Sequence, residues 1–226
     1  MTVRALIAAF NEAPGIARVV TGVRPHVASV LVVDDGSTDG TAEAAAAAGA
    51  SVIRHQVNRG KGAAIRTGLA AVLATDATHV LLLDGDGQHE PADAPALIKA
   101  ACCGGVDFVL GERPFDRASM PRSRYWTNRI SSRVISRYFV GADVGDAQSG
   151  YRLIATDLLR RLRLSARGYE IETEMLIKAA RRGARLARVP ISLRYEGAVS
   201  KLRPWRDTTR TCFLAVRYRF FPERLQ

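Results

Sequence analysis

The chain has 226 residues, of which 47% are hydrophobic and 24% charged, the balance of a globular protein with enough residues for a sizeable buried core. Three cysteines, two of them adjacent (Cys102 and Cys103), exclude a disulfide scaffold and favour a reducing compartment. No apolar run approaches the ~20 residues that a membrane span needs, and the first strand-like run follows the N-terminus without a signal-peptide pattern.

The formal net charge of +11 is unevenly distributed along the chain. Residues 1–110 contain 8 Lys and Arg against 11 Asp and Glu, whereas residues 111–226 contain 25 against 11. We therefore expect the second half to face an anionic partner, which could be nucleic acid, membrane lipid or a phosphorylated substrate.

In chain order, the first half alternates short apolar runs with helical patterns, which predicts βαβ units and a mostly parallel sheet of the α/β class. The predicted strands are Val3–Ala9, Val30–Val33, Ser51–His55, Val80–Leu83 and Val106–Leu110. The predicted helices are Pro14–Val23, Ala42–Ala48, a segment that ends near Leu73 and a segment that begins at Pro91.

Polar clusters follow four of these strands, at the edge where open α/β sheets bind their ligands. The clusters are Phe10-Asn11-Glu12, the segment from Asp34 to Thr41, Asn58-Arg59-Gly60-Lys61-Gly62, and the segment from Asp84 to His89. No G-x-G-x-x-G follows the first strand, and Gly60-Lys61-Gly62 lacks the spacing of a P-loop. The sequence thus predicts a site at this edge, without a dinucleotide fingerprint.

The last of these clusters has the composition of a cation site. Asp84 and Asp86 flank Gly85, so the backbone can bend and both carboxylates can reach the same space. With the amide of Gln88 nearby, they suit a divalent cation, Mg²⁺ or Mn²⁺, that keeps open positions for phosphate oxygens. The alternative is a solvated turn, because Asp and Gly are ordinary turn formers.

The basic half contains two amphipathic patterns. Residues 119–141 predict a helix with one apolar face and with arginines at every fourth position on another face. The apolar residues are Trp126, Ile130, Val134, Ile135, Tyr138 and Phe139, and the arginines are Arg129, Arg133 and Arg137. Residues 205–221 repeat this pattern. We favour helices that lie on a membrane surface over ordinary packing on the sheet, and we expect no nucleic-acid binding, because no recognition motif is present.

The four strand-end clusters, in this order, resemble those of the family 2 glycosyltransferases with the GT-A fold. Within that family the chain resembles the polyprenyl-phosphate sugar transferases, meaning the dolichol-phosphate mannose and glucose synthases and their bacterial relatives. This second resemblance rests on the Asp84–His89 segment and on Asp146–Arg152, Gly168–Glu172 and Ser200–Leu202. It extends from about residue 3 to about residue 202. One departure is Ala9, which stands where the family often has proline.

The resemblance implies roles for individual residues. Those implied at the nucleotide donor or its phosphates are Ala9, Phe10, Glu12, Asp34, Asp35, Lys61, Asp84 and Arg194. Arg113, like Arg124, is implied at the phosphate of the lipid acceptor. Those implied at the metal are Asp84, Asp86 and Gln88. Those implied in catalysis are Asp86, Arg124, Lys201 and Asp146, the last as a base only if the acceptor is a hydroxyl. Other interpretations remain open: Phe10 as a core residue, Lys61 as a surface charge, Asp39 as a helix cap, and His79 and His89 as structural residues.

The resemblance also implies a metal-dependent hexosyltransferase that moves a sugar, with inversion, from a donor such as GDP-mannose or UDP-glucose to a polyprenyl or dolichyl phosphate. A phosphate monoester is largely anionic at neutral pH and needs no strong base to attack. We expect a glycosyltransferase domain over 1–202, with a nucleotide-binding half (1–110), an acceptor-binding half (111–202) and a basic tail (203–226). We expect it on the cytoplasmic membrane face, with a separate transmembrane partner as one hypothesis. The alternatives are a soluble enzyme with a saccharide acceptor, a nucleotidyltransferase and a non-catalytic membrane-binding protein.

Overall fold

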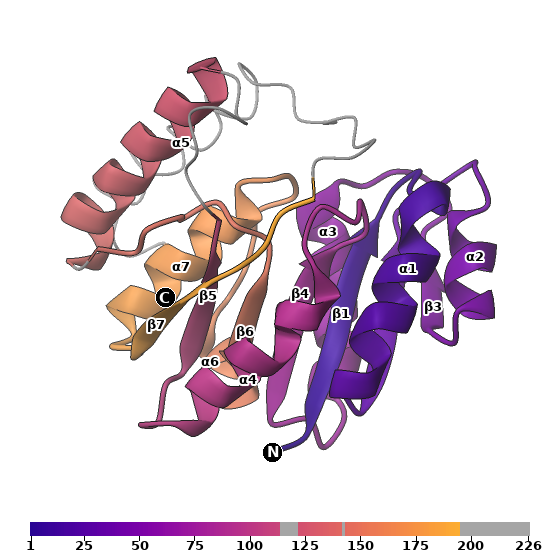
Figure 1. Ribbon diagram of the computed structural model, residues 1–226, viewed down its shortest axis with the longest axis horizontal. Helices are drawn as coiled ribbons and strands as arrows, with labels where there is room; N and C mark the ends of the chain where they lie inside the picture. Colours follow the sequence, from indigo (N-terminus) through magenta and orange to yellow (C-terminus); the bar gives the residue numbers. More distant parts are fainter. Residues whose placement is uncertain (114–121, 142, 195–226) are drawn as a thin grey trace.

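The computed structural model describes residues 1–113, 122–141 and 143–194, without the side chains of 122–128. In this part of the chain a seven-stranded sheet has the order β3-β2-β1-β4-β6-β5-β7 (Figure 1). Strand β6 runs antiparallel to both of its neighbours, and the other pairs are parallel. The expected mostly parallel sheet with flanking helices is confirmed.

The strands are β1 (Val3–Ala9), β2 (Ser29–Asp34), β3 (Ser51–Arg54), β4 (His79–Asp84), β5 (Phe108–Glu112), β6 (Arg152–Ala155) and β7 (Leu186–Pro190). The α-helices are α1 (Ala13–Val23), α2 (Thr41–Ala47), α3 (Lys61–Leu73), α4 (Ala94–Cys102), α5 (Arg122–Ile135), α6 (Thr156–Arg161) and α7 (Ile171–Arg181). The short helical turns are η1 (Arg24–His26), η2 (Pro91–Asp93) and the π-helical η3 (Ser136–Val140).

Helices cover both faces of the sheet, so its central strands read as continuous apolar runs. Neighbouring residues of a strand point to opposite faces: Leu82 and Ile154 pack in a core with α3 and α7, whereas Leu81 and Leu153 pack in a second core with α1 and α4. Figure 1 shows these two helical layers on either side of the strands. The double coverage explains the absence of alternation in β4.

Strand β6 joins the two expected halves of the domain. It lies between β4 and β5, so one sheet continues through both halves. The expected boundary between residues 110 and 111 falls inside β5, which occupies Phe108–Glu112 rather than the predicted Val106–Leu110. Neither β6 nor β7 was predicted.

Helix α5 and the following η3 have two apolar faces, where the sequence predicts one. Ile135 is buried and Phe139 packs against the core, whereas Ile130, Val134 and Tyr138 are 57%, 39% and 61% exposed. The helical segment begins at Arg122 and ends at Val140. The side chain of Trp126 and the predicted helix over 205–221 lie outside the described residues.

Two serines form part of the inner face of this segment. The hydroxyl oxygen of Ser132 accepts a hydrogen bond from the backbone N–H of Ala147, and that of Ser136 accepts one from Val144, each at 3.1 Å. The loop before β6 is therefore attached to the helix by polar contacts. None of the described helices is long and apolar enough to cross a membrane.

Candidate active site

The ends of β1, β2 and β4 bring the predicted clusters together. In the sheet register Ala9 pairs with Asp34 and Ala8 pairs with Asp84, so the acidic residues lie on either side of the end of β1. The backbone N–H of Asp35 donates to the carbonyl oxygen of Ala9 at 2.8 Å. The expected convergence of these loops at one sheet edge is confirmed.

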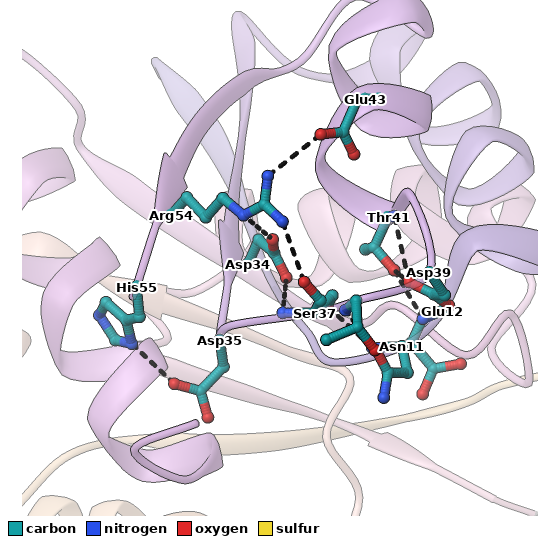
Figure 2. Close-up of polar contacts among 11 residues, drawn as sticks. Asn11, Glu12, Asp34, Asp35, Ser37, Asp39, Thr41, Glu43, Arg54 and His55 are labelled. Carbon is teal, nitrogen blue, oxygen red and sulfur yellow. Dashed lines mark hydrogen bonds and ion pairs between the residues drawn. The ribbon is translucent and has the colours of Figure 1, made fainter. Parts of the chain in front are cut away.

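The loop after β1 is attached to the loop after β2 (Figure 2). The N–H of Asn11 donates to Ser37 Oγ at 2.8 Å, and Asn11 Oδ1 accepts from the N–H of Thr38 at 2.9 Å. The N–H of Glu12 donates to Thr41 Oγ1 at 2.8 Å. The half-buried Phe10 and Glu12 thus sit on a fixed loop beside the acidic turns.

The turn after β4 packs directly on β1 and α1. A β-carbon at Gly85 would lie 3.0 Å from that of Ala9, and one at Gly15 would lie 3.3 Å from the carbonyl oxygen of Asp86. Ala9 itself is 3% exposed. The small side chain of Ala9 leaves room for the turn to pack against β1, and the implied contact of Ala9 with a nucleotide stays a prediction.

Asp84 and Asp86 carry opposite pKa shifts. Burial would raise the pKa of Asp84, but the neighbouring charge of Lys61, with smaller contributions from His89 and Arg113, holds it below its ordinary value. Burial, and next the negative charge of Asp84, raise the pKa of Asp86 to about 6. Asp86 is therefore a carboxylate whose ionised form lacks sufficient compensation from the protein.

This donor set fits a divalent cation. Burial and the negative charge of Asp84 both disfavour the ionised form of Asp86, and a cation held by the hard carboxylate oxygens of the two residues would compensate that charge. The N–H of Gln88 donates to Asp86 Oδ1 at 2.9 Å and orients it. Among the described residues no three His, Cys, Asp or Glu side chains form a complete metal cluster. A divalent cation held by two carboxylates, from Asp84 and Asp86, would keep coordination positions open for phosphate oxygens.

Lys61 lies inside this cluster and is not a solvated surface charge. Its Nζ is 2.6 Å from Asp84 Oδ1 and 2.6 Å from Glu172 Oε1, and its side chain is 15% exposed. Burial would lower the pKa of Lys61, but the charges of Asp84 and Glu172 outweigh burial and raise it. The ammonium group also lies 5.4 Å from the centre of the Tyr169 ring.

The glycines on either side of Lys61 allow this burial. A β-carbon at Gly62 would lie 2.6 Å from the carbonyl oxygen of Ala166. A β-carbon at Gly60 would collide with the carbonyl oxygen of Arg167. The N–H of Ala63 donates to the Arg167 oxygen at 3.2 Å. The start of α3 is thus pressed against the segment before α7, which explains the Gly-Lys-Gly spacing.

Asp34 is engaged by the protein. Its Oδ1 accepts from the N–H of Ser37 at 3.0 Å, and its Oδ2 lies 3.3 Å from Arg54 Nε. Arg54 also donates to Glu43 Oε1 at 3.1 Å and to the Ser37 carbonyl at 3.0 Å (Figure 2). Asp34 is fully buried, whereas Arg54 is 49% exposed. The guanidinium group of Arg54 therefore lies between two carboxylates, and the buried Asp34 Oδ2 accepts no hydrogen bond from the described residues.

Asp35 positions the loop that leads to Lys61. Its carboxylate lies 2.7 Å from His55 Nδ1 and accepts from the N–H groups of Arg59 and Gly60 at 3.0 and 2.7 Å. Its side chain is 3% exposed. The structure therefore supports a positioning role for Asp35, and its implied nucleotide contact stays a prediction.

Asp39 forms the helix-terminal contacts that its position predicts. Its carboxylate accepts hydrogen bonds from the N–H groups of Thr41, at the start of α2, and Ala13, at the start of α1, each at 3.1 Å. One side chain therefore satisfies a free donor at each of two helix ends. The interpretation of Asp39 as a cap is confirmed.

Asp146, in the loop before β6, is bound by Arg113. Arg113 donates from Nη2 to Asp146 Oδ1 at 3.0 Å and from Nε to Oδ2, and the N–H of Gln148 donates to Oδ1 at 3.2 Å. Asp146 is fully buried. Its oxygens thus hold Arg113 and the loop in place.

Two residues of the Asp146–Arg152 segment that had no individual role in the sequence-based expectations, Arg152 and Gly150, pack at the same loop. Arg152 is fully buried and donates to the carbonyl oxygens of Ala147, Ser149 and Glu172 at 2.8, 2.6 and 2.5 Å. Burial lowers the pKa of Arg152 to about 10. A β-carbon at Gly150 would lie 2.6 Å from Asp84 Oδ2.

The segment after β7 reaches the turn after β4. The N–H of Arg194 donates to the carbonyl oxygen of Gln88 at 2.9 Å, and Arg194 Nη1 lies 3.6 Å from Glu90 Oε2. Arg194 is therefore brought to the proposed metal turn. The backbone of Arg124 lies in α5, but its side chain and all of Lys201 fall outside the described residues.

Of the two histidines interpreted as structural, His89 is 4% exposed and its ring centre lies 5.4 Å from that of Tyr151. Burial lowers the pKa of His89 to about 4, so its ring is neutral at pH 7. Burial likewise lowers the pKa of His79, at the other end of β4.

Comparison with known proteins gives a consistent result. The model of the family "Glycosyl transferase family 2" matches residues 5–163. Glycosyltransferase AglJ of Haloferax volcanii is 39% identical over 204 residues, which cover 88% of this chain and 65% of AglJ. Undecaprenyl-phosphate mannosyltransferase of Micrococcus luteus is 32% identical over 205 residues, covering 85% of this chain and 83% of that protein.

A solved structure gives the same fold. Glucosyl-3-phosphoglycerate synthase from Mycobacterium tuberculosis, in complex with Mn²⁺, UDP and glucosyl-3-phosphoglycerate, superimposes with a TM-score of 0.75 at 25% sequence identity. The match covers 96% of this chain and 79% of that protein. Since the family model spans well over half of the sequence and two relatives exceed 30% identity over most of it, the chain belongs to glycosyl transferase family 2.

Proposed function

We propose that the protein is an inverting, metal-dependent glycosyltransferase that moves a single sugar from a nucleotide sugar to a polyprenyl phosphate at a membrane surface. The observation that carries this proposal is the pairing of Lys61 with Asp84 at the sheet edge, together with the influence of the Asp84 charge on Asp86. Relatives named for the same acceptor class, including polyprenol monophosphomannose synthase of Mycolicibacterium smegmatis (30% identical, covering 87% of this chain), support the acceptor.

The donor side follows from the charges at this edge. Asp84 and Asp86, the latter oriented by the N–H of Gln88, would hold the divalent cation, which when bound offsets the charge that develops on the leaving nucleoside diphosphate. Lys61 and Arg194 supply positive charge from two further segments of the chain. Phe10 and Glu12 offer an aromatic face and a carboxylate for a base on the fixed loop after β1.

The state of Asp146 favours a phosphate acceptor over a hydroxyl. A sugar hydroxyl needs a general base within hydrogen-bonding reach, but the carboxylate of Asp146 is fully buried and bound by Arg113. A phosphate monoester already carries negative charge at neutral pH. Positioning by arginine and lysine side chains then suffices, without proton removal.

The exposed ridge of Ile130, Val134 and Tyr138 supports contact with a bilayer. These side chains recur every four residues, with the exposed Arg133 and Arg137 beside them. Apolar side chains next to arginines are typical of helices that bind anionic interfaces. We expect the double variant Ile130→Ser/Tyr138→Ser to sediment less with vesicles that contain anionic lipid.

A control for this test is Val57→Ser, which removes a 67% exposed valine from a loop after β3. It is expected to leave vesicle binding unchanged. Equal sedimentation of the double variant and the Val57 control would contradict the assignment of the ridge to membrane contact.

The transfer reaction is tested directly with purified protein. Thermal shifts with GDP-mannose, UDP-glucose and related donors, each with and without Mn²⁺, identify the donor, and transfer to a short polyprenyl phosphate tests the acceptor. Asp86→Asn is expected to abolish transfer and retain the fold. Asp76→Asn, which alters a carboxylate that is 75% exposed, is the matched control.

Each part of the proposal has its own contradicting result. Near-normal transfer by Asp86→Asn would eliminate the metal role, and transfer to soluble saccharides but not to the lipid phosphate would replace the acceptor. Retention of the donor's anomeric configuration in the product, measured by NMR, would exclude inversion.

A further inference from the structure

Lys61 occupies the position of a cation between two carboxylates. Its Nζ lies 2.6 Å from an oxygen of Asp84 and 2.6 Å from an oxygen of Glu172. The side chains of Lys61, Asp84 and Glu172 are 15%, 25% and 6% exposed, so water screens their interaction little. In this state the charge of Asp84 is compensated from inside the protein.

Asp84 is also one of the two carboxylates that would hold the divalent cation. An ammonium group in direct contact with Asp84 occupies an acceptor oxygen and repels a second cation at close range. The metal and Lys61 therefore compete for Asp84 as long as Lys61 remains where it lies in this structure.

The protein fixes the base of the lysine and leaves its end adjustable. Lys61 is the first residue of α3, and the contacts of Gly60 and Gly62 with the 166–167 segment hold that backbone in place. Four flexible methylene groups separate this fixed backbone from the ammonium group. Its ammonium group can thus exchange one anionic partner for another without moving the helix.

Glu172 can remain paired with Lys61 when the contact between Lys61 and Asp84 is lost. Its carboxylate lies on α7, and its backbone oxygen accepts a hydrogen bond from the buried Arg152 at 2.5 Å. Lys61 can therefore leave Asp84 and remain paired with Glu172. An incoming diphosphate would provide the second anionic partner.

We propose that Lys61 acts as an internal cation that blocks divalent-metal binding to Asp84 in the free protein and makes metal binding depend on the nucleoside diphosphate. The diphosphate draws the ammonium group away from Asp84, and the freed carboxylate then becomes available to the metal. This inference rests on the proposed nucleotide-sugar site.

The test measures Mn²⁺ affinity directly, from the electron paramagnetic resonance signal of free Mn²⁺ in titrations of the whole chain. Without nucleotide, Lys61→Met is expected to bind Mn²⁺ at least about tenfold more tightly than the wild type, a difference of about 1.4 kcal/mol. Addition of UDP or GDP is expected to tighten Mn²⁺ binding to the wild type much more than to Lys61→Met.

Two further variants separate this effect from a general change of charge or fold. Lys61→Arg keeps a cation beside Asp84 and is expected to bind Mn²⁺ as weakly as the wild type when nucleotide is absent. Lys99→Met removes a lysine charge from an exposed position on α4 and is expected to behave like the wild type. Circular dichroism melts confirm that each variant is folded.

The possible failures can be told apart. Equal Mn²⁺ affinities of the wild type and Lys61→Met without nucleotide, together with a normal Mn²⁺–nucleotide complex, would overturn the role of Lys61 and leave the proposed function intact. Absence of Mn²⁺ binding to every folded variant, with or without UDP or GDP, would overturn both.

Discussion

Asp86 and His89 lie three residues apart and respond to acid in opposite directions. Burial lowers the pKa of His89 from 6.5 to about 4, so the unfolded chain takes up this proton first, and stability is lost as the pH falls from about 6.5 towards 4. Burial and the charge of Asp84 raise the pKa of Asp86 from 3.8 to about 6. The folded chain takes up that proton first, so stability is regained as the pH falls from about 6 towards 3.8.

The two contributions have similar size. A difference of one unit between the folded and unfolded pKa corresponds to about 1.4 kcal/mol. His89 therefore removes up to about 3 kcal/mol of stability in acid, and Asp86 restores up to about 3 kcal/mol over nearly the same pH window. In the wild type these two effects largely offset each other, and single variants are needed to reveal them.

The measurement is urea unfolding at several pH values between 7.5 and 4, with a chelator present so that no metal contributes. Relative to the wild type, His89→Gln is expected to gain stability as the pH falls, and Asp86→Asn is expected to lose it. Curves for the two variants that run parallel to the wild-type curve would refute the opposite shifts, and with them the buried, charge-crowded state of this turn.

Three further predictions concern packing around the site. Gly150→Ala places a carbon 2.6 Å from Asp84 Oδ2 and is expected to lower the transfer rate by up to about 100-fold, with only a small change in melting temperature. Arg152→Met removes three hydrogen bonds to buried carbonyl oxygens, and urea unfolding is expected to show a loss of about 3–5 kcal/mol. Gly62→Ala raises helix propensity but overpacks against Ala166, so a loss of about 1–3 kcal/mol is expected; a gain in stability would show that propensity dominates.

The sequence predicts β4 and its acidic turn well because a short, unbroken run of Val and Leu between polar residues is typical of a strand buried on both faces. It does not predict β6, which has four residues and begins with Arg152. Pattern reasoning treats arginine as a surface residue, whereas this one is fully buried and satisfied by carbonyl oxygens. For that reason the sequence pattern does not predict β6, the antiparallel strand between β4 and β5.

Helix α5 illustrates a second limit. Its apolar residues are sufficient to predict a helix, but Ile130 and Ile135 lie on different faces, one exposed and one buried. The inner face also contains Ser132, whose hydroxyl accepts a hydrogen bond from the loop before β6. A small polar residue at a buried position depends on that tertiary partner, so the helical period alone does not predict it.

The candidate site shows why a sequence identifies acidic residues more readily than their roles. Asp34, Asp35 and Asp146 all follow predicted strands or turns. Their carboxylates are paired with the side chains of Arg54, His55 and Arg113, respectively. These partners lie 20 or more residues away in the chain, beyond any local pattern. Asp86 differs because its environment raises its pKa to about 6 instead of stabilising its charge. Among these carboxylates, Asp86 is the one whose negative charge the protein compensates least, so a bound cation would be stabilised most by contact with Asp86.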